Sequence, residues 1–126
     1  MRAHGLRGTE RVFTLPSPTH FALVGIQSST SSTSELVMFT VNLMVVGKAD
    51  WMATRTELDW LPVKPSANAG YPVASQWVER IGILVDGRDH WWSLDARGTM
   101  RDHVSREVVA AITNHGLPAM RTRMTT

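Results

Sequence analysis

The fold is decided by one stretch in the first half of the chain, Leu36-Val37-Met38-Phe39-Thr40-Val41-Asn42-Leu43-Met44-Val45-Val46. Its odd-numbered positions are all apolar, whereas its even-numbered positions include Thr40 and Asn42. Successive side chains of a strand point to opposite faces, and one wholly apolar face is typical of a central strand in an antiparallel sheet. We expect the odd-numbered face to pack against a helix and the even-numbered face to be half exposed.

The polar pair on the even-numbered face has two interpretations. Thr40 and Asn42 could line a binding surface, or they could belong to an ordinary solvated sheet face, which is the commoner case. Asn42 is therefore a candidate binding residue, with the solvated face as the simpler alternative.

Two short β-prone runs precede this strand, at residues 11–15 and 21–27. Between the second run and the central strand, residues 28–34 are all serine or threonine. Such a polar, low-complexity segment is typical of a loop. We expect residues 28–34 to form a mobile loop between two strands.

The region that follows the central strand, from Lys48 to Gln76, is irregular. Residues 49–60 contain good helix formers and predict a short helix with Asp50 as its N-cap. The apolar anchors of this segment are Trp51, Leu58 and Trp60. Prolines beyond it exclude long regular structure, and connections of this length are often functional. The segment is our first choice for a lid or a loop that contacts a partner.

A second informative stretch is Arg80-Ile81-Gly82-Ile83-Leu84-Val85-Asp86-Gly87-Arg88-Asp89-His90-Trp91-Trp92-Ser93-Leu94-Asp95. The Asp-Gly step at residues 86–87 predicts a hairpin between the segments on either side. Residues 76–84 fit a strand and a helix equally well, whereas residues 91–94 favour a strand. Because neighbouring side chains of a strand diverge, one of the two adjacent tryptophans should enter the core and the other should lie on the opposite side.

The chain is expected to end in an amphipathic helix. Apolar residues recur at helical spacing over residues 102–115, and Gly116 followed by Pro118 is a typical stop signal. Residues 119–126 should then be a frayed tail. The predicted fold is a single α+β domain, residues 1–126, with one antiparallel sheet of four to five strands and the C-terminal helix packed on one face.

Composition narrows the class of protein. The 126 residues carry a net charge of only +2 and contain no cysteine, which excludes disulfides and thiolate chemistry. No apolar run approaches the length of a membrane-spanning helix, and the first residues do not resemble a secretory signal. We expect a cytoplasmic protein without contact to a membrane. Nucleic acid is not expected as a partner, because the chain contains no run of like charges.

The search for chemistry yields one weak cluster. None of the five histidines is spaced from another as metal ligands on one element are, and no nucleophile elbow or phosphate-binding loop is present. His90 with Asp89 and Asp95 is the best local candidate for a metal or a general base, although alternation places His90 on the other face. A solvated hairpin end is the simpler interpretation. We assign no catalytic residue, no metal site and no cofactor.

Arg80 and the tryptophans are the remaining candidates. Arg80 lies beside an apolar run, so its guanidinium must reach water, pair with a carboxylate or bind an anion. A salt bridge to Asp89 or Asp95 is the favoured interpretation. The five tryptophans either build a small core, which we favour, or stack along a surface groove.

Several motifs together resemble a known family: Phe39-Thr40-Val41-Asn42-Leu43, Arg80-Ile81-Gly82, Asp89-x-Trp91-Trp92-Ser93-Leu94, and a helix that ends at Gly116-Leu117-Pro118. In this order they resemble the bacterial family called domain of unknown function 4304, over residues 5–118. The resemblance implies an intracellular bacterial α+β domain and no activity. Family members open with a helix that is missing before Gly5-Leu6, so either that helix is dispensable or the start lies late. They also more often have Gly where this chain has Met44.

Three functional hypotheses follow. The first is a non-catalytic binding or protein-interaction module whose candidate residues are Asn42, Trp51, Trp60, Arg80, Asp89, His90, Trp91 and Trp92. The alternative is a small, hydrolytic enzyme with a site near Arg80, Asp89, His90 and Asp95. The third is self-association through an exposed sheet edge or apolar face.

Overall fold

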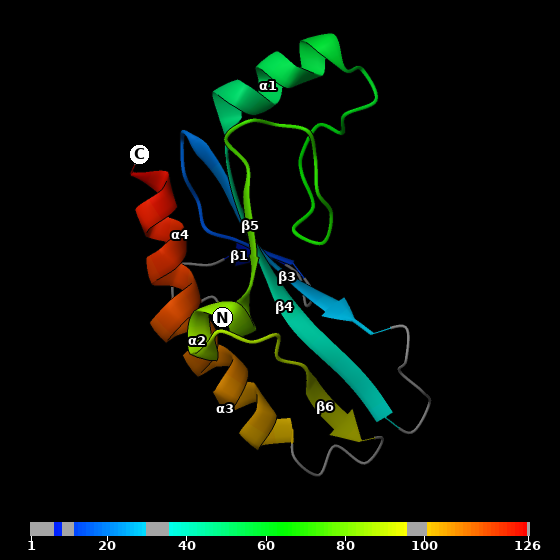
Figure 1. Ribbon diagram of the computed structural model, residues 1–126, viewed down its shortest axis with the longest axis vertical. Helices are drawn as coiled ribbons and strands as arrows, with labels where there is room; N and C mark the ends of the chain where they lie inside the picture. The colour runs from blue at the N-terminus through cyan, green and yellow to red at the C-terminus, as the bar shows by residue number, and fades with distance from the viewer. Residues whose placement is uncertain (1–6, 9–11, 30–35, 96–100, 126) are drawn as a thin grey trace.

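The computed structural model describes residues 7–8, 12–29, 36–95 and 101–125 (Figure 1). A single antiparallel sheet contains β1 (Arg7–Gly8), β2 (Val12–Thr14), β3 (His20–Ser28), β4 (Leu36–Gly47), β5 (Trp77–Arg80) and β6 (Trp92–Asp95). The described residues also form four α-helices: α1 (Lys48–Glu57), α2 (Ile81–Asp86), α3 (Arg101–Ala111) and α4 (Leu117–Met124). A π-helical segment (Ile112–Gly116) joins α3 to α4. Among the described residues, no helix is both long and apolar enough to cross a membrane.

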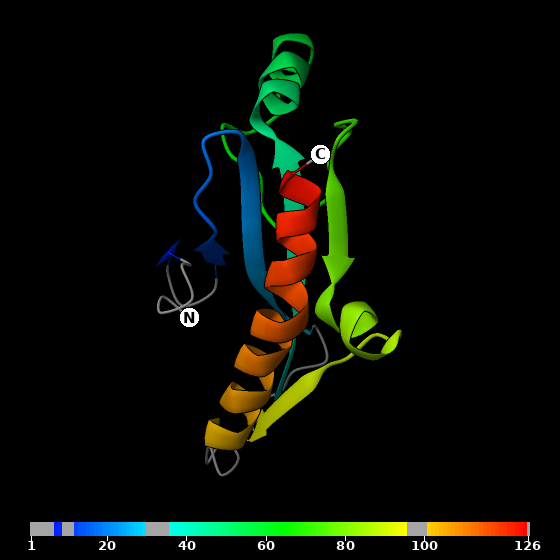
Figure 2. The same ribbon diagram turned by 90° about the vertical axis from the view of Figure 1, so that its left-hand side faces the viewer.

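β4 is the centre of the sheet. β3 pairs with it from His20↔Gly47 to Ser28↔Phe39. On its other side, β5 pairs with residues 42–45 and β6 with residues 36–39. β5 and β6 therefore share one edge, so five strand positions lie side by side. The predicted α+β fold with one antiparallel sheet of four to five strands is confirmed, including the helix over one face (Figure 2).

The two faces of β4 are covered differently. Val41, Leu43 and Val45 point to one face, which we call the inner face, where they are buried against α2, the π-helical segment and α4. Met44 and Val46 point to the opposite, outer face and are also fully buried. The expectation of a half-exposed even-numbered face is wrong for Asn42, Met44 and Val46, because residues 58–76 fold back over this part of the strand. We call residues 58–76 the outer layer.

The outer layer is anchored by the helix before it. Trp51 of α1 is completely buried and packs edge-on against Tyr71 and Phe21. Its indole Nε1 donates to the carbonyl oxygens of Pro62 and Val63 at 3.1 Å. The sequence predicted Asp50 as the N-cap of α1. The N-cap is Gly47 instead, because the chain enters the helix directly from β4. The segment predicted to be a lid or contact loop thus forms a second core with the sheet.

The predicted hairpin around Asp86 and Gly87 is wrong. Residues 77–80 are strand and residues 81–86 are helix, so each of the two alternatives for this segment holds for one half of it. A Cβ on Gly82 would lie 2.4 Å from the carbonyl oxygen of Arg88, so the chain can fold back this tightly only at a glycine. Gly87, with φ of 76°, ends α2 in the left-handed conformation and does not form a strand turn.

The C-terminal helix does not stop at Gly116 and Pro118. It continues to Met124, and Met120, in the segment predicted to fray, is completely buried. The π-helical segment widens the helix just before Pro118, which lacks a backbone donor and needs room for its ring. Gly116 allows the helix to pack closely against α2, because a Cβ at this position would lie 2.9 Å from Ile81 Cδ1. Of the predicted mobile loop at 28–34, Ser28 ends β3, and residues 30–34 lie outside the described residues.

Candidate functional site

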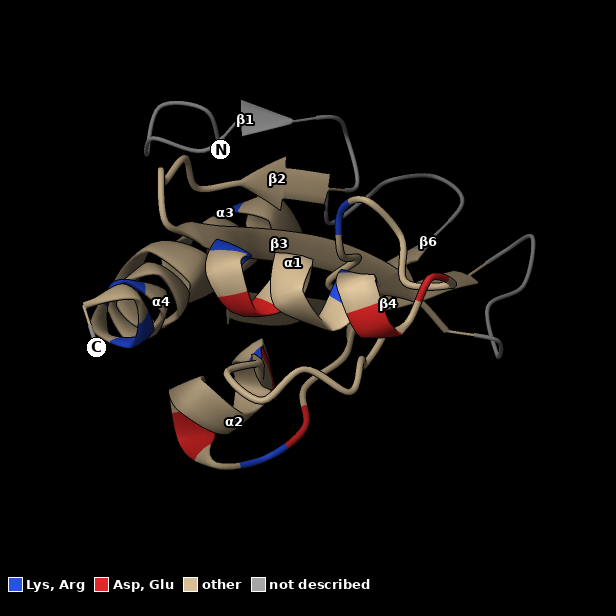
Figure 3. Ribbon diagram, turned by 90° about the horizontal axis from the view of Figure 1, so that it is seen from above, with Lys and Arg blue, Asp and Glu red and all other residues tan. Residues whose placement is uncertain are grey.

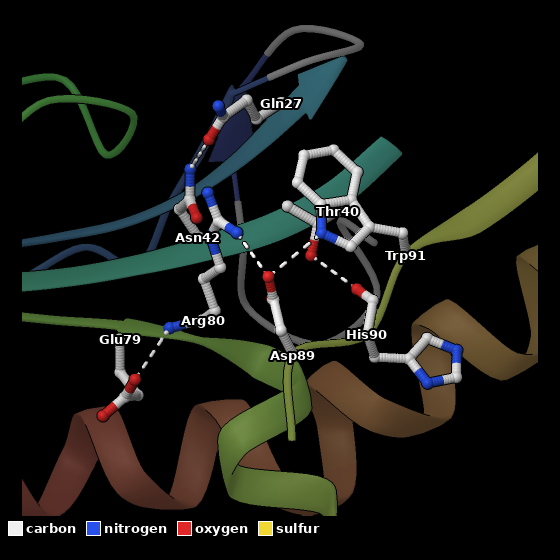
Figure 4. Close-up of polar contacts among 8 residues, drawn as sticks. All are labelled: Gln27, Thr40, Asn42, Glu79, Arg80, Asp89, His90 and Trp91. Carbon is white, nitrogen blue, oxygen red and sulfur yellow. Dashed lines mark hydrogen bonds and ion pairs between the residues drawn. The ribbon is translucent and has the colours of Figure 1, made fainter. Parts of the chain in front are cut away.

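The candidate site is built where the edge of the sheet is interrupted. The chain pairs with β4 up to Arg80, at the end of β5, and pairs with it again from Trp92, at the start of β6. The interval between these two strands consists of α2 and residues 87–91. Side chains in this interval diverge to the two faces of the sheet (Figure 4). Arg80, Asp89 and Trp91 meet on the outer side, whereas the ring of His90 turns toward α3.

The three side chains on the outer side form a compact unit, which we call the Arg80 clamp (Figure 4). Arg80 Nη1 donates to Asp89 Oδ2 at 2.6 Å, and Trp91 Nε1 donates to the same oxygen at 3.1 Å. The guanidinium carbon of Arg80 lies 5.1 Å from the centre of the Trp91 ring, which adds a cation–π contact. The side chains of Arg80 and Asp89 are 37% and 44% exposed. The predicted salt bridge between them is present.

The ionisation of Asp89 reflects this arrangement. Partial burial raises the pKa of the carboxyl group, but hydrogen bonds from Trp91 and Arg80, the charge of Arg80 and the backbone N–H of His90 outweigh it. The net result is a pKa below the usual value of an aspartate. Asp89 therefore stays ionised and keeps the guanidinium of Arg80 in place at neutral pH.

The floor of the site is a network of side-chain amides centred on the buried Asn42. Asn42 is 6% exposed, and its Nδ2 donates to Gln27 Oε1 at 2.7 Å and to Asn68 Oδ1 at 2.9 Å. Asn68 Nδ2 in turn donates to the carbonyl oxygen of Ile26 at 3.3 Å. The network joins β3 and β4 to the outer layer. Asn42 therefore does not lie on an open sheet face, which was the simpler of the two expectations.

Thr40 supports the neighbouring segment in the same way. It is completely buried, and its Oγ1 donates to the carbonyl oxygen of His90 at 2.7 Å. This bond ties residues 89–91 to the centre of the sheet. Since Thr40 and Asn42 alternate with the inner-face core residues, the pattern of β4 itself fixes both the floor of the site and the position of the Arg80 clamp.

A pocket of about 300 Å³ lies between these parts, and we call it the Arg80 pocket. Its walls are Gln27, Asn42, Ala67–Gly70 and Val78–Arg80. Sequence reasoning missed Gln27 and Asn68, because they lie 15 and 26 residues from Asn42 and no local pattern connects them. The residues that line the pocket include side-chain amides, the guanidinium of Arg80, the acidic residue Glu79 and an apolar wall, and the amide and guanidinium donors can hydrogen-bond a polar group.

The other predicted site residues lie elsewhere. Trp92 is buried on the inner side and stacks on Phe39 with ring centres 5.9 Å apart, so the prediction that one tryptophan enters the core and the other lies opposite is confirmed. Trp51 belongs to the core beneath the outer layer, and Trp60 is 62% exposed near the end of α1. The structure brings neither of them to the Arg80 pocket.

His90 lines a different pocket, of about 290 Å³, together with Trp92, Glu107 and His115. Its ring lies 4.5 Å from the ring of Trp92, and no hydrogen bond joins it to a carboxylate of the described residues. The side chain of Asp95 lies outside the described part of the structure. In the described part, no three His, Asp or Glu side chains are placed to hold a metal ion.

Comparison with known proteins gives one match. The model of a protein family described as "Domain of unknown function (DUF4304)" matches residues 1–122. No curated protein and no solved structure matches the chain.

Proposed function

Since the chain belongs to the domain of unknown function 4304 family, whose description carries no activity, we propose from the geometry that it is a non-catalytic binding module. It docks a segment of a partner protein at the Arg80 pocket, and the group recognised is a carboxylate of that partner. A cytoplasmic location and a bacterial source are part of this proposal.

The observation that carries the proposal is the fixed position of the Arg80 guanidinium at the wall of the pocket. An arginine normally loses about 2 kcal/mol of side-chain conformational freedom when it is immobilised. In the Arg80 clamp, Asp89 and Trp91 already hold the side chain, so less of this cost remains at binding. Arginine and tryptophan are also the residue types enriched among interface residues that contribute most to affinity.

The chemistry of the pocket selects a carboxylate. A guanidinium has five N–H donors in a planar fork, and only Nη1 donates to Asp89 among the described residues. The remaining donors match a carboxylate, which accepts two parallel hydrogen bonds. Asp89 balances the charge of Arg80, so the affinity depends on further contacts, which Gln27, Asn68 and Val78 can supply.

The hydrolytic alternative is less well supported by the geometry. A general base would need His90 and a carboxylate on the same side of the chain. His90 turns toward α3, whereas Asp89 turns to the outer side and is already occupied by Arg80 and Trp91.

The test is a selection of short random peptides displayed on phage against the purified protein. We expect the selected peptides to be enriched in Asp and Glu. One such peptide is then compared with its version in which the acidic residues are replaced by Asn or Gln. Arg80→Lys should weaken binding of the acidic peptide about tenfold, because Lys cannot form the bidentate contact, and should not change binding of the amide peptide.

The matched control is Arg88→Lys, at an exposed position after α2 that is not in the wall of the pocket. It should bind the acidic peptide as the wild type does. Thermal unfolding of Arg80→Lys should stay close to that of the wild type, since the side chain is partly exposed. Equal binding by both variants, or no enrichment of acidic residues, would overturn the proposal.

A further inference from the structure

The chain contains only two lysines, and both lie at one pocket. Lys48 and Lys64 line a cavity of about 370 Å³ on the outer face, between the β2–β3 connection and the outer layer. In the view from above, basic segments of α1 and of the following loop lie on the side toward β2 and β3 (Figure 3). This cavity, which we call the lysine pocket, lies on the β2 side of the outer layer, and the Arg80 pocket lies on the β5 side.

Lys48 is held in place by two contacts. Its Nζ donates to the carbonyl oxygen of Ser17 at 2.7 Å and lies 5.4 Å from the centre of the Phe21 ring. An ammonium group has three donors, so this hydrogen bond leaves two for a ligand. Neither lysine forms an ion pair with any residue of the described part of the chain.

His20 lines the same pocket. Ser17 Oγ accepts hydrogen bonds from the backbone N–H groups of Thr19 and His20, so its own proton can go to Thr19 Oγ1, 3.3 Å away. Thr19 Oγ1 in turn shares a hydrogen bond with His20 Nδ1, 2.8 Å away, in which the tautomer of the ring sets the donor. Because Nδ1 is engaged by Thr19, Nε2 is the ring nitrogen of His20 that remains for a ligand.

The described residues that line the lysine pocket include no Asp or Glu, while apolar side chains such as Val12 and Phe21 form part of its walls. Lysine binds phosphate as a compact point charge. We propose that the lysine pocket binds a small organic phosphate. The phosphate group lies between Lys48, Lys64 and His20, and the organic part lies against the apolar wall.

The test uses the fact that a protein grown on isotope-labelled lysine gives signals from only two side chains. Inorganic phosphate and phenyl phosphate are added separately, and the Cε signals of both lysines are followed by NMR. Both signals should shift with one common dissociation constant. Phenyl phosphate should bind about tenfold more tightly than phosphate, because its ring leaves water for the apolar wall, and phenol alone should shift neither signal.

Lys64→Gln removes one charge from an exposed side chain and should weaken phenyl phosphate binding about tenfold. The control Arg88→Gln removes the same charge at an exposed position outside the pocket and should leave binding unchanged. For Lys64→Gln the Lys48 signal remains as the readout, and an unchanged amide spectrum shows that this variant is folded. The proposal is overturned if phosphate shifts only one lysine signal, or if Arg88→Gln weakens binding as much as Lys64→Gln.

Discussion

The inner and outer faces of β4 differ in the kind of layer that covers them. A continuous helix from Arg101 to Met124 covers the inner face together with α2. The outer face is covered by residues 58–76, which contain no helix or strand. A regular helix presents an apolar stripe that can follow a strand over many residues, whereas an irregular segment covers only the part of the sheet where its apolar side chains happen to lie.

The difference explains where polar pockets form. At one border of the outer layer, beside Ala67, its apolar contacts give way to the side-chain amides of Asn42 and Asn68 and to the Arg80 clamp. At its other border, Pro65 and Lys64 meet the β2–β3 connection and form the lysine pocket. Both proposed sites therefore lie along the borders of the outer layer, so the stability of this layer and the two binding functions should be linked.

The largest expected effect is a loss of stability when a large side chain is removed from either of the two cores, on the outer or on the inner face of β4. Trp51→Ala should destabilise the protein by about 3–5 kcal/mol, and Leu43→Ala on the inner face by about 2–5 kcal/mol. Urea unfolding measures both losses. Hydrogen exchange should then show that Trp51→Ala accelerates exchange in residues 58–76 more than in α4, because the lost side chain belongs to the core of the outer face and not to that of the inner face. Uniform acceleration of both layers would mean that the two cores unfold as one unit.

The second prediction compares a glycine beneath each layer. A Cβ on Gly25 would lie 2.7 Å from Asn68 Oδ1 and 2.9 Å from Ala67 Cβ, so Gly25→Ala must displace the outer layer. We expect a loss of about 1–3 kcal/mol in urea unfolding. A Cβ on Gly116 comes closest to the end of the flexible Ile81 side chain and touches Leu43 Cδ1 at 3.4 Å, and Gly116→Ala gains up to about 1 kcal/mol of helix propensity, so its net effect should be smaller.

The control for this pair is Gly70→Ala, where a Cβ would have no neighbour within 4 Å. It should change stability very little, which would show that the loss at Gly25 comes from the contact and not from the exchange of glycine for alanine itself. If Gly116→Ala proved the more damaging of the two, the helix would be packed more rigidly than the outer layer.

The third prediction concerns the amide network at the border. Asn42→Ala removes the donor shared by Gln27 and Asn68 and should cost about 1–2 kcal/mol, since each lost hydrogen bond contributes roughly 0.5–1.5 kcal/mol. Asn114→Ala, at an exposed position of the π-helical segment, is the control and should change stability by less than about 0.5 kcal/mol. Thermal and urea unfolding measure both. A neutral Asn42→Ala would mean that water replaces the network without loss.

The contrast between the two layers also sets how much the sequence could predict. The inner core follows from local periods, because alternate residues of β4 and the helical spacing of Val104 and Val108 each point to it. The outer core does not, since Leu61, Ala67 and Val73 follow no period and are brought together only by long-range contacts. The pairing of Arg80 with Asp89 was predictable, because a charged group beside an apolar run needs a partner.

The helix boundary and the edge of the sheet were mispredicted for a related reason. Gly116 and Gly82 match local signals for a helix stop and a weak helix, but both are glycines because another segment approaches closely. A sequence pattern reports the backbone preference of a glycine and not the neighbour that requires it. Gly87, by contrast, is required by a positive φ, and its Asp-Gly signal marks a turn of the chain even though the turn ends a helix.

The smallest expected effect is at the Arg80 clamp, on the β5 side of the outer layer. The pKa of Asp89 is lower in the folded protein than its usual value, so the pair with Arg80 stabilises the fold above the usual aspartate range and this contribution is lost as the pH falls through the folded pKa. Asp89→Asn should lower the melting temperature slightly at pH 7, because exposed ion pairs contribute at most about 1 kcal/mol. The melting curves of wild type and variant should converge in acid, and high salt should reduce their difference at pH 7. A difference that persisted unchanged at a pH well below the aspartate range would show that the Asp89 carboxyl acts through packing, which would make the clamp part of the core and not a border of the outer layer.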